Sequence, residues 1–375
     1  MPERNRTTAA ARPPEATVPA APSPGGAARE ARGPGGAPLL DVRHLRKLYP
    51  IKAGPLKRTV GHVRAVDDVS FQVHDGEILS LVGESGCGKT TTAKCVLRAV
   101  DPTAGEVLFR LPNGEVVDVA KLSEGQLRPL RSQMQLVFQD PFGSLNPRKN
   151  LLDIIGEPLL VHGVKSRQQR MDRVAELLNL VGLRPEYMHR YPHAFSGGQR
   201  QRVVIARALA LEPRLVVADE AVSALDVSVQ AQILNLLLDL QRRLDLSYLF
   251  VAHDLSIVKH ISHRVAVMYV GKIVELAPTE ELFHRPRHPY TSALMQAVPV
   301  PDPDKRAALR GLPGEVANPA DPPKGCYFHP RCPFATDVCR SETPVLREVG
   351  PGHHVACHRA EELDLPGIDE LERVA

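Results

Sequence analysis

Apolar residues follow two repeating patterns along the chain, and their alternation predicts an α/β fold. The runs 77–82 and 214–218 are mostly apolar, as expected of strands buried on both faces. Elsewhere apolar residues recur at helical spacing, most clearly over 166–181 and 229–240. Strands that alternate with helices favour a mainly parallel sheet as the core.

A different pattern near the N-terminus predicts an antiparallel β subdomain beside that core. Apolar and polar residues alternate over 39–43, as in an edge strand, and again over 69–73. The polar segment 51–63 lies between them and is interpreted as an insertion. The runs 107–109 and 116–119 flank a Pro-Asn-Gly turn and predict a hairpin.

The remaining apolar runs add more strands and a helical subdomain. Residues 150–190 are mainly helical in pattern, so a helical subdomain is expected at about 140–200, and another helix is expected from Ser196 to about Leu211. Further strands are expected at 134–138 (as a core strand), 248–252, 265–268 and 273–276.

Composition divides the chain into three expected regions. Residues 1–38 are rich in Ala, Pro, Gly and Arg and have almost no large apolar residue, so a disordered tail is expected. The strand and helix patterns occupy 39–285. Residues 286–375 are expected to form a Cys-rich C-terminal extension.

The numbers of basic and acidic residues indicate which kinds of partner the overall charge could attract. The 375 residues include 47 basic and 43 acidic ones, a net charge of +4, which gives no case for nucleic-acid binding by bulk charge. No apolar run approaches the roughly 20 residues of a membrane helix. The chain is therefore expected to be soluble and cytoplasmic, with any membrane role exercised through partners.

The segment from Gly83 to Thr90 carries the most specific chemistry. It matches the phosphate-binding pattern G-x-x-x-x-G-K-[ST] between an expected strand and an expected helix, the context that this motif requires. Its glycines let N–H groups converge on one phosphate, and the helix adds its positive end. Lys89 is expected to reach the outer phosphates, and the Thr90 hydroxyl to hold Mg²⁺. A Gly-rich turn without a ligand is the alternative.

Two acidic residues follow an apolar strand, at the edge where parallel sheets bind ligands. Asp219 is expected to hold Mg²⁺, directly or through water. Glu220 is placed to act as general base on an attacking water. Such a pair alone would be interpreted as a solvated turn, but the upstream phosphate loop favours function.

The segment Ser196–Gln199 opens a predicted helix. Ser196 and Gln199 match a capping box, which explains neither Gly197 nor Gly198. Consecutive glycines expose N–H groups, so a second phosphate-binding helix end is expected. The stretch Ser223–Asp226 also matches a capping box and, alone, is interpreted as a cap. Three further residues would alone be ordinary structural ones: Tyr49, Gln139 and His253.

Taken together, these residues resemble the nucleotide-binding subunit of an ABC transporter, over roughly residues 39–280. The family's order is an adenine-contacting aromatic residue, Walker A, Q-loop, signature, Walker B, D-loop and H-loop. The matching residues here are Tyr49, Gly83–Thr90, Gln139, Ser196–Gln199, Asp219-Glu220, Ser223–Asp226 and His253. The resemblance implies a P-loop NTPase of ABC type.

The resemblance also implies residue roles. Glu220, His253 and Lys89 would be catalytic, while Mg²⁺ would be held by Thr90, Gln139 and Asp219. Signature residues would contact ATP held by a partner subunit. The residues expected to contact ATP are Tyr49, Gly83, Glu84, Ser85, Gly86, Cys87, Gly88, Lys89, Thr90, Thr91, Gln139, Ser196, Gly197, Gly198, Gln199 and Asp226.

Four stretches resemble oligopeptide and dipeptide importers in particular: 51–63, 138–148, 221–230 and 288–294. The function so implied is ATP hydrolysis that powers peptide import at the cytoplasmic face of the cell membrane. The implied partners are a second ABC ATPase subunit, in a homo- or heterodimer, two transmembrane permease subunits and, indirectly, an extracytoplasmic solute-binding protein.

Alternatives to peptide import remain open. The solute of such an importer could be nickel or a sugar instead of a peptide. A non-transport ABC ATPase of translation would normally carry two motif sets, and a chromosome-condensing one would insert a long coiled coil. A redox protein would leave the ATP motifs unexplained.

Four of the six cysteines lie near the C-terminus with the spacing C-x5-C-x6-C-x17-C. A reducing cytoplasm disfavours two disulfides, and zinc sites usually contain a closer cysteine pair. Four thiolates at irregular spacing favour a [4Fe–4S] cluster, and some peptide-importer ATPases carry one in a similar extension. Zinc and free thiols stay open. The four are Cys326, Cys332, Cys339 and Cys357.

Overall fold

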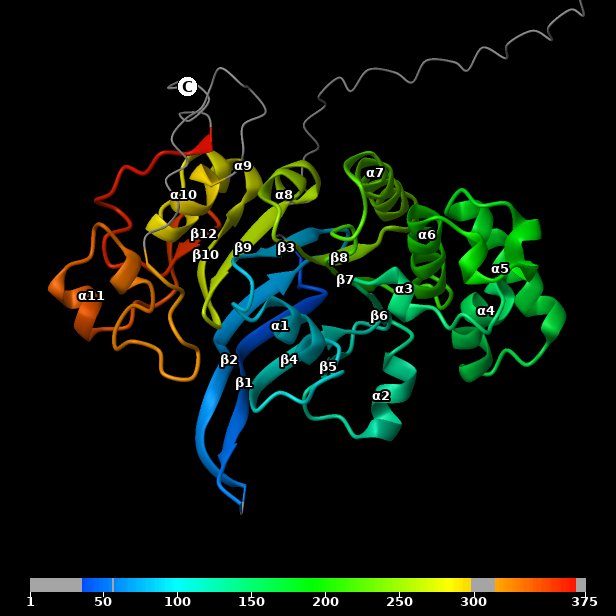
Figure 1. The fold of residues 1–375 in the computed structure, drawn as a ribbon, viewed down its shortest axis with the longest axis horizontal. Helices are drawn as coiled ribbons and strands as arrows, with labels where there is room; N and C mark the ends of the chain where they lie inside the picture. The colour runs from blue at the N-terminus through cyan, green and yellow to red at the C-terminus, as the bar shows by residue number, and fades with distance from the viewer. Residues whose placement is uncertain (1–35, 56, 298–313, 369–375) are drawn as a thin grey trace, which may run out of the picture. The chain divides into compact units, whose positions relative to one another are not determined.

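An eight-stranded sheet carries the phosphate-binding loop, and Figure 1 shows it in the computed structural model, which describes residues 36–55, 57–297 and 314–368. Its order is β11-β12-β10-β9-β3-β8-β7-β6. The strands from β9 to β6 pair in parallel, and the other three are antiparallel, which confirms the mainly parallel core. The bounds are β3 (Ile78–Val82), β6 (Met134–Val137), β7 (Leu215–Asp219), β8 (Ser247–Val251), β9 (Arg264–Tyr269), β10 (Lys272–Pro278), β11 (Arg347–Gly350) and β12 (His353–Val355).

A second sheet, antiparallel and of order β2-β1-β4-β5, lies beside the first as expected (Figure 1). Its strands are β1 (Leu40–Ala53), β2 (Arg58–Val73), β4 (Ala104–Arg110) and β5 (Val116–Asp118). Strand β1 pairs with both β2 and β4, so the prediction of an edge strand at 39–43 was wrong. The segment 51–63 is largely the far end of the β1–β2 hairpin, in which Tyr49 pairs with Val63 and Lys52 with Thr59.

Strand β6 belongs to the core as predicted, and it does so from the edge of the sheet. In the described sheet β6 pairs only with β7. Val137 is nevertheless fully buried, because helices cover the face it points to. An apolar run indicates that the side chains are buried. The side chains of an edge strand can be buried as well as those of a central strand.

Helices cover both faces of the large sheet and form a separate group to one side of it (Figure 1). The α-helices are α1 (Lys89–Val96), α2 (Glu124–Leu130), α3 (Pro141–Ser144), α4 (Leu151–Val161), α5 (Arg167–Leu180), α6 (Gly197–Ala208), α7 (Val227–Leu244), α8 (Leu255–Ile261), α9 (Thr279–His284), α10 (Pro289–Gln296) and α11 (Asp337–Ser341). The 3-10 turns are η1 (Pro185–His189), η2 (Pro192–Ala194) and η3 (His329–Arg331).

The helix starts follow their capping residues, with one correction. Ser166 caps α5 and Ser196 caps α6, each accepting a hydrogen bond from the backbone three residues later. The cap of α7 is Asp226, whose carboxylate accepts from Val229 N at 3.0 Å. Ser223 is not a cap, because its hydroxyl donates instead to the carbonyl of Glu220. Ser and Asp are both common N-cap residues, so the sequence alone could not decide between Ser223 and Asp226 as the cap of α7.

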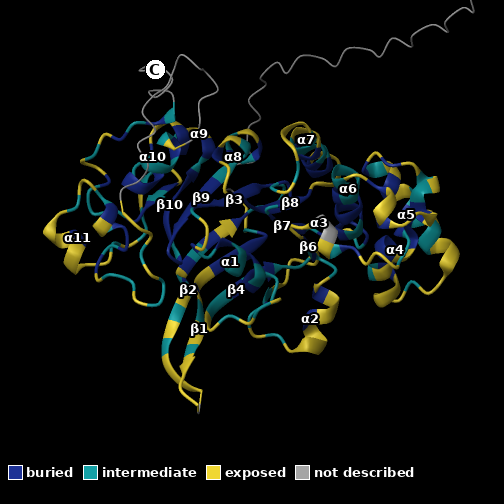
Figure 2. Ribbon diagram, in the orientation of Figure 1, coloured by how far each residue is buried: buried dark blue, intermediate teal, exposed yellow. Residues whose placement is uncertain are grey.

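The C-terminal residues 314–368 share the core of the large sheet. Strands β11 and β12 extend its edge beyond β10, and Phe328 packs with ring centroids 5.3 Å from Tyr269 and 5.4 Å from Tyr290. Figure 2 shows that buried residues continue from the sheet into this region. The expected disordered tail, 1–38, lies outside the described residues except for its last three positions. No helix in the described part of the chain is long and apolar enough to cross a membrane.

Candidate ATP-binding and hydrolysis site

The phosphate-binding loop runs from β3 into α1, the arrangement that its sequence predicts. Gly83 has φ +146° and Gly88 has φ +109°, conformations that L side chains rarely adopt. A Cβ at Gly83 would lie 2.2 Å from the Met268 carbonyl oxygen, and one at Gly88 would lie 2.1 Å from that of Ala65. Glycine is therefore required at both positions for the loop to pack against β9 and β2.

The Lys89 ammonium lies inside this loop. Its Nζ donates hydrogen bonds to the carbonyl oxygens of Gly83 at 2.8 Å and Glu84 at 3.0 Å, and the residue is only 5% exposed. The Cys87 side chain is buried beside it, and burial raises the pKa of that thiol above its ordinary value. Lys89 thus places a buried positive charge at the start of α1. The positive end of the helix dipole lies at the same point, so both favour the binding of an anion there.

Thr90 and Asp219 bring two oxygen ligands together from different elements. Thr90 Oγ1 donates a hydrogen bond to Asp219 Oδ1 at 2.9 Å. Asp219 is buried at the end of β7, and this burial raises the pKa of its carboxyl above the ordinary value, although the Thr90 hydrogen bond and nearby Lys94 act in the opposite direction. A hydroxyl and a carboxylate that face each other are a suitable donor set for Mg²⁺.

Glu220 is held in an unusual backbone conformation with partners on both carboxylate oxygens. Its φ is +48°, a left-handed value that is uncommon for a residue with a side chain. Gln139 Nε2 donates to Glu220 Oε2 at 2.7 Å, and His253 Nδ1 lies 3.4 Å from Glu220 Oε1. The ends of β6, β7 and β8 thus meet around one carboxylate, where a general base would be needed.

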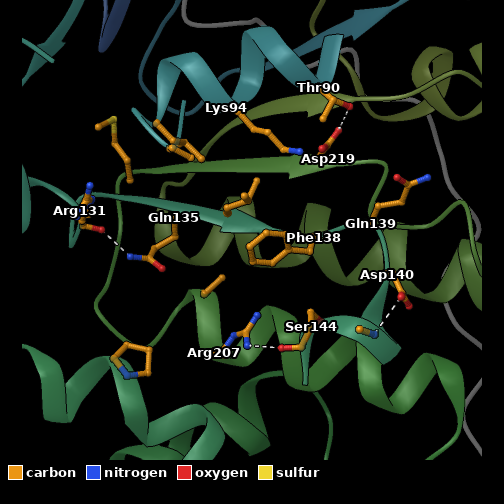
Figure 3. Close-up of a pocket in the computed structure, with 17 residues that line it drawn as sticks. Thr90, Lys94, Arg131, Gln135, Phe138, Gln139, Asp140, Ser144, Arg207 and Asp219 are labelled. Carbon is orange, nitrogen blue, oxygen red and sulfur yellow. Dashed lines mark hydrogen bonds between the residues drawn. The ribbon is translucent and has the colours of Figure 1, made fainter. Parts of the chain in front are cut away.

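A cavity of about 880 Å³ lies next to Gln139 and Asp219 and is lined by residues of α1, β6, α3, α4 and α6. Figure 3 shows the residues that line it. Thr90, Gln139 and Asp219 lie on its wall, together with Asp140 and Ser144 of the following segment. Lys94 reaches from α1 toward Asp219 (Figure 3). Sequence reasoning missed Lys94, although it lies four residues after Thr90 and so on the same face of the helix.

The segment Ser196–Gln199 lies at the start of α6. Ser196 Oγ accepts from Gln199 N, and Gln199 Oε1 accepts from Ser196 N, so the expected capping box is present. Gly198 has a structural explanation that the sequence did not reveal: a Cβ there would lie 2.5 Å from Cγ1 of Val229 at the start of α7. At Gly197 a Cβ would make only ordinary contact, 3.5 Å from Leu225.

The other expected ATP contacts are distributed as follows. Tyr49 lies on β1 and is 39% exposed, with Lys47 Nζ 4.9 Å from its ring centroid. Ser85 and Gly86 are exposed on the phosphate loop, and Thr91 is half-buried on α1. Asp226 is exposed at the α7 cap, where the hydrogen bond from Ser228 lowers the pKa of its carboxyl.

The four C-terminal cysteines line one small cavity of about 20 Å³, room for about one water molecule. Burial raises the pKa of the Cys326 thiol to about 11 and that of Cys357 to about 12, and it also raises the pKa of Cys332. Among the described residues, no group of three or more His, Cys, Asp or Glu side chains is placed to hold a metal ion. The expected [4Fe–4S] cluster and its zinc alternative are therefore not supported by this geometry.

The comparisons with protein families agree with the fold and the motifs. A family model described as "ABC transporter" matches residues 66–223. A second, described as "Oligopeptide/dipeptide transporter, C-terminal region", matches residues 274–339. The two matches cover the phosphate loop, the Asp219-Glu220 pair and three of the four C-terminal cysteines.

Several curated proteins resemble the chain over most of its length. A probable peptide ABC transporter ATP-binding protein of Sinorhizobium fredii is 56% identical over 320 residues, which are 85% of this chain and 89% of that protein. The oligopeptide transport ATP-binding protein AppF of Bacillus subtilis is 51% identical over 325 residues, 85% of this chain and 97% of that protein. The di/tripeptide transport ATP-binding protein DppF of Pseudomonas aeruginosa is 46% identical over 86% of this chain and 98% of its own.

The chain also resembles solved structures of ATP-binding cassettes. A dimeric ATP-binding cassette in a post-hydrolysis state, bound to ADP and Pi, matches with a TM-score of 0.55 and 28% identity over 64% of this chain and 98% of that one. The ATPase cassette fold and the resemblance drawn from the sequence motifs are thus confirmed. The chain belongs to the family of ATP-binding subunits of oligopeptide and dipeptide ABC transporters.

Proposed function

We propose that this protein binds MgATP on its phosphate loop and that hydrolysis of the ATP powers import of peptides by a membrane transporter. The observation that carries the proposal is the hydrogen bond between Thr90 Oγ1 and Asp219 Oδ1, at the mouth of a loop that buries Lys89. Lys89 and the loop N–H groups would bind the phosphates, while Thr90, Gln139 and Asp219 would hold Mg²⁺. When bound, Mg²⁺ supplies positive charge that neutralises the phosphate oxygens.

In the proposed hydrolysis Glu220 accepts a proton from the attacking water. Gln139 and His253 support the assignment, because they contact opposite oxygens of its carboxylate and so fix its direction. Oxygen of the water then attacks the γ-phosphorus in line with the departing ADP oxygen, and Lys89 stabilises the negative charge on the transferred group. Gln139 is proposed to report the state of this site to the loop that follows it.

The proposed ATP site is completed by a second ATPase subunit, identical or homologous. Ser196, Gly197 and Gly198 would contact the γ-phosphate of ATP on that partner, and Asp226 would lie at the interface. The position of these residues in the first turn of α6, where N–H groups lack partners within the helix, supports this role, although Gly198 is also required for packing against Val229. The dimeric cassette structure bound to ADP and Pi, to which the chain is similar, supports a dimer.

We propose that the transporter has two permease subunits and that one of them docks on the cavity next to Gln139. This docking would place the protein on the cytoplasmic face of the membrane. The cavity joins the catalytic edge of the sheet to the segment after β6, so a subunit seated there could sense Glu220 through Gln139. A solute-binding protein outside the membrane would deliver the peptide. The names of the curated relatives support peptides over nickel or sugars.

Cross-linking tests this docking surface. Asn146 and Arg148 are exposed, whereas Leu145 is 3% exposed and unsuitable as a probe. A cysteine at Asn146 should cross-link to a permease subunit in the assembled transporter, and a cysteine at exposed Lys165, just before the cap of α5, serves as control. Absence of a cross-link from Asn146 would contradict the docking surface.

The cluster assigned to the four cysteines stays a proposal of its own. All four thiols line one cavity, which supports a shared ligand, and Fe–S clusters are held by cysteine thiolates. Iron and sulfide analysis of anaerobically purified protein tests this. Stoichiometric iron and sulfide would support the cluster, and stoichiometric zinc or no metal would refute it.

We also propose the division of the chain into a tail at 1–38, an ATPase domain at 39–285 with a helical subdomain at about 140–200, and a C-terminal extension at 286–375. The grouping of α4 and α5 away from the large sheet supports the helical subdomain (Figure 1). Limited proteolysis tests these boundaries, since cleavage between domains should concentrate near residues 38 and 286.

A further inference from the structure

The carboxylate of Glu84, in the phosphate-binding loop, is held by a residue 247 positions later in the chain. Arg331 Nη1 donates to Glu84 Oε2 at 2.8 Å, and Arg331 Nη2 donates to Glu84 Oε1 at 3.1 Å. Two parallel hydrogen bonds between a guanidinium and a carboxylate fix the direction of the carboxylate as well as its position. The hydrolysis proposed above uses neither side chain.

Arg331 is itself held firmly by its surroundings. Its side chain is only 5% exposed, whereas that of Glu84 is 26% exposed. The guanidinium carbon lies 5.8 Å from the ring centroid of Tyr269 and 5.9 Å from that of Phe328. A planar guanidinium among aromatic rings loses little freedom when it forms its ion pair, so Arg331 is a preorganised partner.

A second contact from the same region holds the backbone of Glu84. Its N–H donates a hydrogen bond to the hydroxyl of Tyr290, at 2.9 Å, and Tyr290 is fully buried against Phe328. Both the backbone and the side chain of Glu84 are therefore positioned by residues after β10. The loop around Glu84 contains three glycines with positive φ, which alone would leave it many conformations.

We propose that Arg331 is a positioning residue for the phosphate-binding loop, which neutralises Glu84 and holds the loop ready for the phosphates of ATP. The inference rests on the proposed binding of ATP to Gly83–Thr90. Without Arg331, the Glu84 carboxylate would stand unpaired beside the negatively charged phosphates and would oppose their binding. The C-terminal region would thereby contribute to nucleotide affinity without touching the nucleotide.

The first arm of the test compares Arg331→Gln with Arg340→Gln in the full chain. Arg340 lies on α11 in the same region, but its side chain is 64% exposed. Calorimetric titration with ATP should show about tenfold weaker binding for Arg331→Gln, because a buried ion pair is broken beside the site. Arg340→Gln should bind ATP like the wild type. Thermal unfolding of each variant reports whether it is folded.

The second arm asks whether the loss comes from the exposed charge of Glu84. The double variant Arg331→Gln/Glu84→Gln should bind ATP several-fold more tightly than the single variant Arg331→Gln, because it removes the unpaired carboxylate. A merely structural role of Arg331 would leave the double variant as weak as the single one. Arg331→Lys keeps the charge and loses the fork, so a smaller loss is expected and is measurable even if Arg331→Gln fails to fold.

The outcomes separate this inference from the proposed function. Wild-type protein that does not bind ATP would refute the function itself. Wild-type binding together with unchanged affinity in Arg331→Gln, or in Arg331→Lys where Arg331→Gln does not fold, would overturn only the role of Arg331. A loss that Glu84→Gln does not relieve would overturn it too, and loss with relief would support it.

Discussion

Gln139 Nε2 donates a 2.7 Å hydrogen bond to Glu220 Oε2, and this bond ties the end of β6 to the end of β7. The other carboxylate oxygen of Glu220 faces His253 Nδ1 at 3.4 Å. The side chain proposed to activate water is therefore directed by two neighbours from separate strands. Gln139 also begins the segment that lines the cavity of about 880 Å³, so movement of that segment would displace the proposed general base.

Loss of the Lys89 ammonium should weaken ATP binding. Lys89→Ala removes the buried cation of the phosphate loop, and a charged hydrogen bond contributes about 1.5–3 kcal/mol, so the affinity should fall at least about tenfold. Equilibrium titration with ATP measures this. Lys165→Ala removes an exposed lysine on the surface and serves as the control. Unchanged affinity in Lys89→Ala would mean that the loop does not bind phosphate as proposed.

The Thr90 hydroxyl should matter for the use of magnesium. Thr90→Val keeps the size of the side chain but cannot hold the metal or donate to Asp219. Its ATPase rate should fall at least about tenfold, and the Mg²⁺ concentration for half-maximal rate should rise. Thr90→Ser retains the hydroxyl and should stay near the wild-type rate. Equal rates in the valine and serine variants would contradict the metal assignment.

Asp219 should reduce stability at neutral pH. Because burial raises the pKa of its carboxyl, the folded protein binds a proton more readily than the unfolded chain, and stability from this group falls as pH rises above the ordinary pKa of about 3.9. Asp219→Asn should therefore unfold at a higher temperature than the wild type at pH 7 in the absence of Mg²⁺.

The advantage of Asp219→Asn should shrink as the pH is lowered and should vanish below the ordinary pKa of a carboxyl, where Asp219 is protonated in both states. ATPase activity should be lost in this variant at every pH. Scanning calorimetry over a pH series makes the measurement. A variant less stable than the wild type at pH 7, or an advantage that grows in acid, would refute the argument.

Gly198 should be required by the start of α7. A methyl group at this position would lie 2.5 Å from Val229 Cγ1, so Gly198→Ala should lower the free energy of unfolding by about 1–3 kcal/mol. Val229→Ala in the same chain should restore most of the loss, because it removes the opposing methyl groups. Denaturant unfolding of the single and double variants checks this, and additive losses would contradict the clash.

Elements whose signals are local were predicted well from the sequence. The Gly83–Thr90 loop, the strand that ends at Asp219 and the capping box at Ser196 each depend on residues within a few positions of one another. Short-range geometry of this kind is dictated by backbone conformation and by side-chain hydrogen bonds to nearby N–H groups.

Features that depend on distant partners could not be predicted. The alternation of apolar and polar residues at 39–43 could not reveal that β1 has a neighbouring strand on each side. The apolar run at 134–138 could not reveal that β6 has only one neighbouring strand in the described sheet. The ion pair of Glu84 with Arg331 joins segments 247 residues apart. From the sequence, Gly198 is interpreted only as a phosphate-binding residue. Its close packing against Val229, which also requires glycine, is visible only in the fold.

The measurement that tests the account most directly is ATP binding and hydrolysis by Glu220→Gln, in the transporter reconstituted with its permease subunits. Glutamine keeps the shape of the side chain and can still contact Gln139 and His253, but it cannot accept the proton of water. The variant should bind ATP as tightly as the wild type, while hydrolysis and peptide uptake fall by about a hundredfold or more. Hydrolysis and uptake at the wild-type rate would contradict the assignment of Glu220 as the general base.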